Sequence, residues 1–157
     1  MSPAAQDSSA PAWMAPGRSR VSTFLVCDSP IEVAGFAKTV FGAEERRAPL
    51  FRSDGRLWNL ELALGEHTIM LGEATDGMRR PGFVYVHVPD ADATYRAALD
   101  AGGRPVMEPE DRFYGDRDGG VEDIGGNWWW IASHRETLDD GEIEARAADF
   151  EAEGQPS

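Results

Sequence analysis

Two stretches of the chain carry the same succession of hydrophobic and polar patterns. In each, an apolar, β-branched run leads into a stretch with helical spacing, and three short strand-like segments follow. The first half is predicted to contain a strand at 22–27, a helix at 31–41 and strands at 45–51, 57–64 and 67–72. The second half is predicted to contain a strand at 83–88, a helix at 92–101 and strands at 104–108, 118–123 and 128–133. The chain therefore contains an internal repeat, two copies of a unit of about 60 residues.

The repeat predicts an α+β fold built from two βαβββ modules, at about residues 19–74 and 81–136. A module of this kind has one sheet face covered by its helix and the other face open. Two modules are expected to form a cup-shaped, partly closed sheet with the helices outside and a cavity within. Residues 1–18, rich in Ala, Pro and Ser, are predicted to be a disordered leader.

The charge of the chain is strongly acidic and unevenly spread. Its 15 basic and 28 acidic residues give a net charge of −13. Residues 137–157 form an acidic tail, and the spacing of Ile143, Ala147 and Phe150 predicts a short amphipathic helix within it. Such a charge argues against nucleic-acid binding and against docking on an anionic membrane, because both depend on cationic side chains.

Cysteine content and hydropathy further limit the class of protein to which this chain can belong. The single Cys27 cannot form an internal disulfide, and no Cys/His cluster suggests a structural zinc site. No apolar run approaches the roughly 20 residues that a membrane-spanning helix needs, and the N-terminus lacks the features of a signal peptide. A cytoplasmic protein is expected.

Three short strings carry a resemblance to a known family. They are Phe41-Gly42-Ala43-Glu44, Phe113-Tyr114-Gly115-Asp116-Arg117 and Asp123-Ile124-Gly125-Gly126-Asn127-Trp128-Trp129-Trp130. Together with the repeat, they resemble the vicinal-oxygen-chelate superfamily, which contains glyoxalase I, bleomycin-resistance proteins, fosfomycin-modifying enzymes and extradiol dioxygenases. The last string is similar to the family's Asp-Pro-x-Gly-Asn/His turn, with Ile124 in place of Pro. The resemblance covers about residues 20–136 and implies the fold, whereas many functions share that fold.

Metal-dependent members of this family place ligands at four strand positions that face the cup. Two of them lie seven residues before the Asp that leads into each helix, which gives Val21 and Phe83 here. The position on the last strand falls on Trp130, and the fourth falls near Met70. Val, Phe and Trp cannot ligate a divalent cation, and Met is a poor ligand for hard cations. The resemblance therefore predicts that the family's metal site is absent and that no cofactor is bound.

Strand alternation predicts which other side chains point into the cup beside these aromatic residues. On the strands that hold Phe83 and Trp130, every second residue points into the cup, while the valines, Trp129 and Ile131 face the helix. In the first half, Asn59 and Glu61 share a face opposite Trp58 and three leucines, which are expected to pack in a dry core. A lid loop around Arg117 is expected to meet an anionic group. The predicted ligand-binding residues are Phe83, Tyr85, His87, Asn59, Glu61, Trp128, Trp130 and Arg117.

The first functional hypothesis is a binding protein that sequesters a small aromatic or cationic organic molecule without a metal. An aromatic-walled pocket with few polar groups is typical of a small-molecule site. Bleomycin-resistance proteins, which are also acidic, bind a drug in this way and are usually homodimers. The expected partners are therefore a small molecule and a second copy of the chain, as in antibiotic-sequestering resistance proteins.

Two alternatives remain open. In one, the protein is a metal-free isomerase, cyclase or lyase in which His87 or Glu61 is the general acid or base. In the other, it is a metal enzyme with ligands at Glu61, Glu73, His67 and His87. Each candidate also has a structural interpretation, since His87 can hydrogen-bond within a strand, Glu61 can lie at an exposed rim and Arg117 can form a loop salt bridge.

Overall fold

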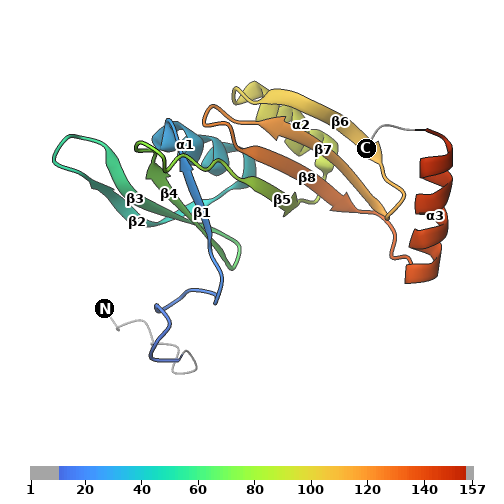
Figure 1. The fold of residues 1–157 in the computed structure, drawn as a ribbon, viewed down its shortest axis with the longest axis horizontal. Helices are drawn as coiled ribbons and strands as arrows, with labels where there is room; N and C mark the ends of the chain where they lie inside the picture. The colour runs from blue at the N-terminus through green and yellow to red at the C-terminus, as the bar shows by residue number, and fades with distance from the viewer. Residues whose placement is uncertain (1–10, 155–157) are drawn as a thin grey trace. The chain divides into compact units, whose positions relative to one another are not determined.

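The computed structural model describes residues 11–154 of the chain, which divides into two compact units, 1–82 and 83–157. Each unit has a four-stranded mixed sheet with a helix on one face (Figure 1). The predicted α+β fold with two βαβββ modules is confirmed. The first ten residues of the predicted leader and the last three of the acidic tail lie outside the described residues.

Unit 1 contains strands β1 (Thr23–Cys27), β2 (Glu44–Phe51), β3 (Leu57–Leu64) and β4 (His67–Glu73), and helix α1 (Pro30–Phe41). Its strand order is β1-β4-β3-β2, with β1 parallel to β4 and the other pairs antiparallel. Helix α1 packs on β3 and β4 over a core of aliphatic side chains. The largest members of that core are Leu25, Leu60, Leu62, Ile69 and Leu71.

Unit 2 repeats this topology with strands β5 (Phe83–His87), β6 (Arg104–Asp111), β7 (Asp116–Glu122) and β8 (Trp128–His134), and helix α2 (Ala91–Asp100). Its order, β5-β8-β7-β6, has β5 parallel to β8 and the other pairs antiparallel. Helix α2 packs on β6, β7 and β8. Trp129, Ile131, Val121 and Val86 are buried on that side, as strand alternation predicts.

The two helices begin differently, although both follow the predicted pattern. Ser29 is the N-cap of α1, with a left-handed backbone (φ 54°) and no side-chain cap hydrogen bond, and Pro30, a residue favoured at a first helical position, begins the helix one residue before the predicted start. In α2, the side chain of Asp90 accepts a hydrogen bond of 3.1 Å from the Ala93 N–H. Asp90 is itself the N-cap of α2, whereas the N-cap of α1 is Ser29, the residue after Asp28. The helix therefore begins one residue later relative to Asp28 than relative to Asp90.

The glycine turn before β8 is organised by a buried carboxylate. Asp123 accepts hydrogen bonds from the backbone N–H groups of Gly125 (2.8 Å) and Asn127 (3.0 Å) and from the Asn127 side chain. It also accepts one of 2.7 Å from the Trp129 indole. The Asp-x-Gly-Gly-Asn string that supports the family resemblance thus stabilises the fold.

One packing prediction was wrong. Trp58 was expected in the dry core with the leucines of its strand, but its side chain is 52% exposed. It lies in the row of Leu60 and Leu62 toward one end of β3, where the guanidinium of Arg52 stacks 3.7 Å from the ring centroid. An arginine stacked on an indole replaces burial at this position, because the cation–π contact leaves one ring face in water.

The acidic tail contains helix α3 (Asp140–Ala152), capped by the side chain of Asp139. None of its residues is buried. Its attachment to the rest of unit 2 includes a ring contact of 5.4 Å between Phe150 and Phe113 and an ion pair between Arg146 and Glu136. Between residues 11 and 154, no helix has the length and apolar character required to cross a membrane.

Candidate functional site: the open sheet faces

The sheet face of unit 2 that points away from α2 gathers most of the predicted site. The register of β5 against β8 places Phe83 opposite Trp128 and Tyr85 opposite Trp130. His87 follows on the same face, opposite Ala132. We call the patch formed by Phe83, Tyr85, Trp128 and Trp130 the aromatic face. The structure therefore brings together five of the eight predicted ligand-binding residues.

Three rings of the aromatic face contact one another. The ring centroid of Phe83 lies 5.6 Å from that of Trp128 and 5.0 Å from that of Trp130, and the two indoles stack at 6.0 Å. These separations fall in the range of favourable aromatic pairs. Phe83 nevertheless remains 60% exposed and Trp128 38% exposed. The cluster is thus preorganised but leaves ring surface uncovered.

A glycine makes room for the Trp130 indole. Gly120 of β7 lies directly opposite Trp130, and a Cβ built on it would be only 2.1 Å from the indole Cζ3. No side chain can replace this hydrogen without displacing the ring. Gly120 therefore fixes how Trp130 is presented on the aromatic face.

Beside the aromatic face lies a buried carboxylate, Asp118 of β7. Its Oδ1 accepts a 2.8 Å charged hydrogen bond from Arg112 Nε, and its Oδ2 accepts hydrogen bonds from the phenols of Tyr114 and Tyr85, the latter at 3.2 Å. The side chain of Asp118 is fully buried. Arg112 and Tyr114 each donate to this buried carboxylate, and Tyr85 shares its single proton between Asp118 and the neighbouring Asp116, so Asp118 is well stabilised and orients both phenols.

A second carboxylate, Asp116, joins a tyrosine and two histidines. It accepts hydrogen bonds of 2.6 Å from the Tyr85 hydroxyl and 2.7 Å from His134 Nδ1. His87 Nε2 lies 3.5 Å from Asp116 Oδ2. His87 is itself largely exposed, and its ring contacts that of Tyr85 at 5.3 Å. The predicted acid–base residue is therefore held against a carboxylate at the edge of the aromatic face.

This network raises the pKa values of its two tyrosines and lowers the pKa of Asp116. Burial raises the pKa of the Tyr85 phenol well above its ordinary value, and the hydrogen bond to Asp116 and the charges of Asp118 and Asp116 add to the shift. Burial and the hydrogen bond to Asp118 likewise raise the pKa of Tyr114. For Asp116, burial favours the neutral acid, but hydrogen bonds from Tyr85 and His134 outweigh it and lower the pKa. The phenols are therefore donors and the carboxylate an acceptor.

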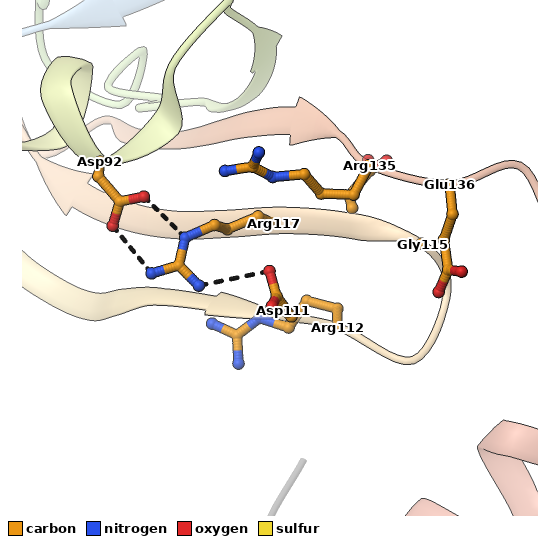
Figure 2. Close-up of a pocket in the computed structure, with 8 residues that line it drawn as sticks. Asp92, Asp111, Arg112, Gly115, Arg117, Arg135 and Glu136 are labelled. Atoms are coloured by element: carbon orange, nitrogen blue, oxygen red, sulfur yellow. Dashed lines mark hydrogen bonds and ion pairs between the residues drawn. The ribbon is translucent and has the colours of Figure 1, made fainter.

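Arg117 lies on the other face of β7 and is not part of this group. Its guanidinium binds both oxygens of Asp92, at 2.7 Å and 2.9 Å, and reaches Asp111 at 3.3 Å (Figure 2). The predicted lid loop is also shorter than expected, because the pairing of β6 with β7 continues to Asp111 and Arg117. These residues line an open polar pocket of about 590 Å³, together with Arg112, Gly115, Asp116, Arg135 and Glu136.

Asn59 and Glu61 belong to unit 1, on the face of its sheet away from α1. Glu61 is only 5% exposed, so it does not lie at an exposed rim. Its Oε1 accepts a hydrogen bond of 3.2 Å from the Asn59 side chain, and its Oε2 forms an ion pair with Arg18. Arg18 comes from the segment predicted to be a leader, and no sequence pattern linked it to β3.

The position counted for the first metal ligand was wrong by one residue. Strand pairing aligns Phe24 with Met70 in unit 1 as it aligns Tyr85 with Trp130 in unit 2. Ser22, rather than Val21, is therefore the counterpart of Phe83. The reason is the later N-cap of α1, which shifts every count taken from Asp28.

The residues at the family's metal positions do not fit a metal ion. Phe83 and Trp130 fill two of the positions with rings in mutual contact, and Met70 and Ser22 supply a thioether and a neutral hydroxyl. None of these is a ligand of the kind that hard divalent cations select.

The alternative metal set of the sequence analysis is not brought together either. His67 and Glu73 lie at opposite ends of β4, a strand of seven residues, and so are about 20 Å apart. His67 instead pairs with the Thr23 hydroxyl at 2.7 Å. In the described part of the chain, no three His, Cys, Asp or Glu side chains are grouped so that they could hold a metal ion.

Sequence reasoning missed Asp116, Asp118, Tyr114, Arg112 and His134 as members of the site. The signal that could have found two of them is the alternation along β7, where Asp116 and Asp118 occupy every second position leading to Gly120, and Tyr114 lies two residues before Asp116 in the preceding turn. That signal was hidden because the segment was assigned to a loop. Arg112 and His134 come from neighbouring strand ends and reach the carboxylates only through tertiary contacts.

Comparison with known proteins places this chain in a family. The family model described as the Glyoxalase/Bleomycin resistance protein/Dioxygenase superfamily matches residues 14–131. The chain belongs to this superfamily. Within it, the chain is 30% identical over 138 residues to an uncharacterized protein of Mycobacterium bovis, covering 80% of this chain and 90% of that protein. An uncharacterized protein of Mycobacterium tuberculosis is likewise 30% identical over 138 residues, covering 80% of each chain.

Solved structures of the superfamily share the fold. The crystal structure of TioX from Micromonospora sp. ML1 aligns with a TM-score of 0.60 and 20% identity, covering 74% of this chain and 98% of that one. A glyoxalase/bleomycin resistance protein/dioxygenase family enzyme from Burkholderia phytofirmans PsJN aligns with a TM-score of 0.56 and 18% identity, covering 73% and 95%. At these identities, the likeness concerns the fold alone.

Proposed function

We propose that the aromatic face of unit 2 binds a small, flat organic molecule, and that it prefers a cationic one. The observation that carries the proposal is the cluster of Phe83, Trp128 and Trp130, whose rings contact one another and in which Phe83 and Trp128 are exposed. Grouped aromatic side chains that a folded unit leaves uncovered are typical of a binding surface. The gain on binding comes from stacking and from removing ring surface from water.

The preference for a cation rests on the charges around the aromatic face. Glu122 lies at one end, where its Oε1 is 3.4 Å from the Trp128 indole nitrogen. Asp116 and Asp118 lie beyond Tyr85 at the other end. Ring faces and carboxylates both attract a positive charge, and a net charge of −13 raises the local concentration of cations.

This mode of binding needs no metal. Resemblance to bleomycin-resistance proteins, which hold a drug without chemical change, supports the same interpretation. A protein of this kind protects a cell by keeping a toxic molecule away from its target. We infer a homodimer and a cytoplasmic location as parts of the same proposal. Light scattering after size exclusion tests the dimer, which should have twice the chain mass of 17.2 kDa.

Binding of proflavine, a planar aromatic cation, tests the proposed site. Trp130→Leu and Phe83→Leu should each weaken proflavine binding about tenfold or more, because each removes a stacking surface. Anthracenecarboxylate, a planar anion of similar size, should bind more weakly than proflavine to the wild-type protein. Fluorescence titration gives both affinities.

Trp58→Leu is the matched control for that titration. It removes a tryptophan of unit 1 that is 52% exposed and that stacks on Arg52 rather than on the aromatic face. Proflavine affinity should be unchanged in this variant. Equal losses in Trp58→Leu and Trp130→Leu would show non-specific adsorption and would refute the proposed site.

The second candidate function, metal-free acid–base catalysis, is favoured by the contact between His87 and Asp116. His87 Nε2 lies 3.5 Å from Asp116 Oδ2, so the carboxylate orients the imidazole, and the largely exposed ring is accessible to a substrate. Tyr85 donates its single proton to the carboxylates, and its hydrogen bond to Asp116 holds in place the carboxylate that contacts His87. Glu61 is less suited to be the base, because Arg18 and Asn59 engage its two oxygens.

Mass spectrometry of small molecules that co-purify with the protein separates the two functions. An unchanged molecule after long incubation supports sequestration, and a new product supports catalysis. If a product forms, His87→Gln should abolish it with binding retained. Turnover that survives this substitution would rule out His87 as the base.

A further inference from the structure

The open face of unit 1 holds a buried carboxylate whose charge is neutralised from outside the sheet. Glu61 projects from β3 opposite Met70 of β4 and is almost fully buried. Its ionic partner, Arg18, lies before β1 and belongs to no helix or strand. Arg18 Nη1 also lies 3.9 Å from the Met70 sulfur. The guanidinium therefore occupies a niche formed by a carboxylate, an amide and a thioether.

This niche offers more acceptors than Arg18 uses. The Oδ1 of Asn59 and the hydroxyl of Thr68 are buried and have no hydrogen-bond partner among the described residues. Thr68 is fully buried, and alternation along β3 and β4 places it on the same face as Met70 and Glu61. Burying a polar atom without a hydrogen-bond partner costs free energy. These two atoms therefore indicate a place where another polar group binds.

The occupant, Arg18, lies on the segment before β1, and a side chain of β2 joins this segment to the sheet. The backbone near Arg18 is held by the hydrogen bond of 2.5 Å from Arg46 Nη1 to the Gly17 carbonyl. Ser19 bonds to the Val21 carbonyl within the same segment. A tethered group competes at an effective concentration in the millimolar range, so a free ligand of the same chemistry can displace it.

We propose that the open face of unit 1 is a binding site for a guanidinium, amidinium or ammonium group of a small molecule, and that Arg18 is its built-in competitor. Glu61 supplies the counter-charge, and Asn59 Oδ1 and Thr68 Oγ1 accept the additional N–H groups. A planar cation with several donors suits these acceptors better than a neutral ligand. This inference does not depend on the aromatic face of unit 2.

Calorimetric titration with benzamidine, an aromatic amidinium, tests the site. Arg18→Ala should bind benzamidine at least tenfold more tightly than the wild-type protein, because the internal competitor is gone. Adding Glu61→Gln in the Arg18→Ala background should remove that gain. Arg20→Ala is the matched control, since Arg20 stacks near Trp13 and does not contact the niche, and it should behave as wild type.

A stability measurement covers the case in which Arg18→Ala weakens the fold by leaving Glu61 unpaired. Benzamidine should then restore the lost melting temperature, and benzyl alcohol, its neutral counterpart, should not. Arg18→Gln, which keeps N–H donors but no charge, should bind benzamidine with intermediate affinity. Equal benzamidine affinity in wild type and Arg18→Ala, or the same gain after Glu61→Gln, would overturn the inference.

The outcome is separable from that of the proposed function. Phe83→Leu and Trp130→Leu should leave benzamidine binding to Arg18→Ala unchanged. Failure of proflavine binding with retained benzamidine binding would refute the aromatic face alone, and the reverse result would refute the unit 1 site alone.

Discussion

The Trp129 indole donates a hydrogen bond of 2.7 Å to Asp123 Oδ2 inside the core of unit 2. Asp123→Ala should lower the free energy of unfolding by about 3 kcal/mol, because it removes the buried acceptor of the hydrogen bonds from the indole, Gly125 and Asn127. Urea unfolding followed by tryptophan fluorescence measures this loss. Asp139→Ala, which removes an exposed cap of α3, should cost about 1 kcal/mol or less. Equal losses would contradict the role of Asp123.

Gly120→Ala should impair ligand binding more than stability. The added Cβ would meet the Trp130 ring, which must then rotate away from Phe83. Proflavine affinity should fall about tenfold, toward that of Trp130→Leu. Gly35→Ala in α1 is the control, since nothing lies within 4 Å of its Cβ position. It should raise the free energy of unfolding by about 0.5–1 kcal/mol and leave proflavine binding as it is.

The tyrosines should resist ionisation as long as the protein is folded. Burial raises the pKa of Tyr85, Tyr95 and Tyr114, the three tyrosines of the chain, above the ordinary value of 10.0. Each therefore contributes stability that is present below pH 10 and lost as the pH rises above it. Near-ultraviolet absorbance should show little tyrosinate until the protein unfolds in alkali, and then a single cooperative rise. A gradual rise near pH 10 with native circular dichroism would contradict this assignment.

Asp116 should make stability depend on acid pH. Hydrogen bonds from Tyr85 and His134 outweigh burial and lower its pKa below the ordinary 3.8, so the folded state favours the carboxylate. Its contribution is complete above that value and is lost as the pH falls through the lower pKa of the folded state. The stability difference between wild type and Asp116→Asn should be constant near neutral pH and shrink below about pH 4. A difference that grows in acid would contradict the sign.

The sequence predicted the repeat and the faces of unit 2 because local patterns determine both. Alternation along β8 separated Trp129, which is buried, from Trp128 and Trp130, and the structure agrees. The prediction that Trp58 is buried was wrong, because the apolar character of an indole does not reveal that it is exposed and stacks on a neighbouring arginine. At this position a tertiary contact, the stacking of Arg52 on Trp58, replaces burial of the indole.

The polar parts of the site were less accessible to sequence reasoning. The contact between Arg18 and Glu61 spans 43 residues, and nothing local marks an arginine before a strand as the partner of a buried glutamate. Arg117 was predicted to meet a ligand, but its fork is engaged by Asp92 and Asp111 on the other side of β7. A side chain's partner is a property of the assembled sheet, so spacing along the chain could not specify it.

The matched pairing of the two sheets means that most positions of the chain exist twice, with different chemistry. Met70 corresponds to Trp130, and Glu61, opposite Met70, corresponds to Gly120, opposite Trp130. Two copies of one sheet topology can carry different side chains at equivalent positions, and these pairs differ in this way. They also provide an exchange rule for engineering, because a side chain moved between partner positions arrives at the same place on an equivalent strand.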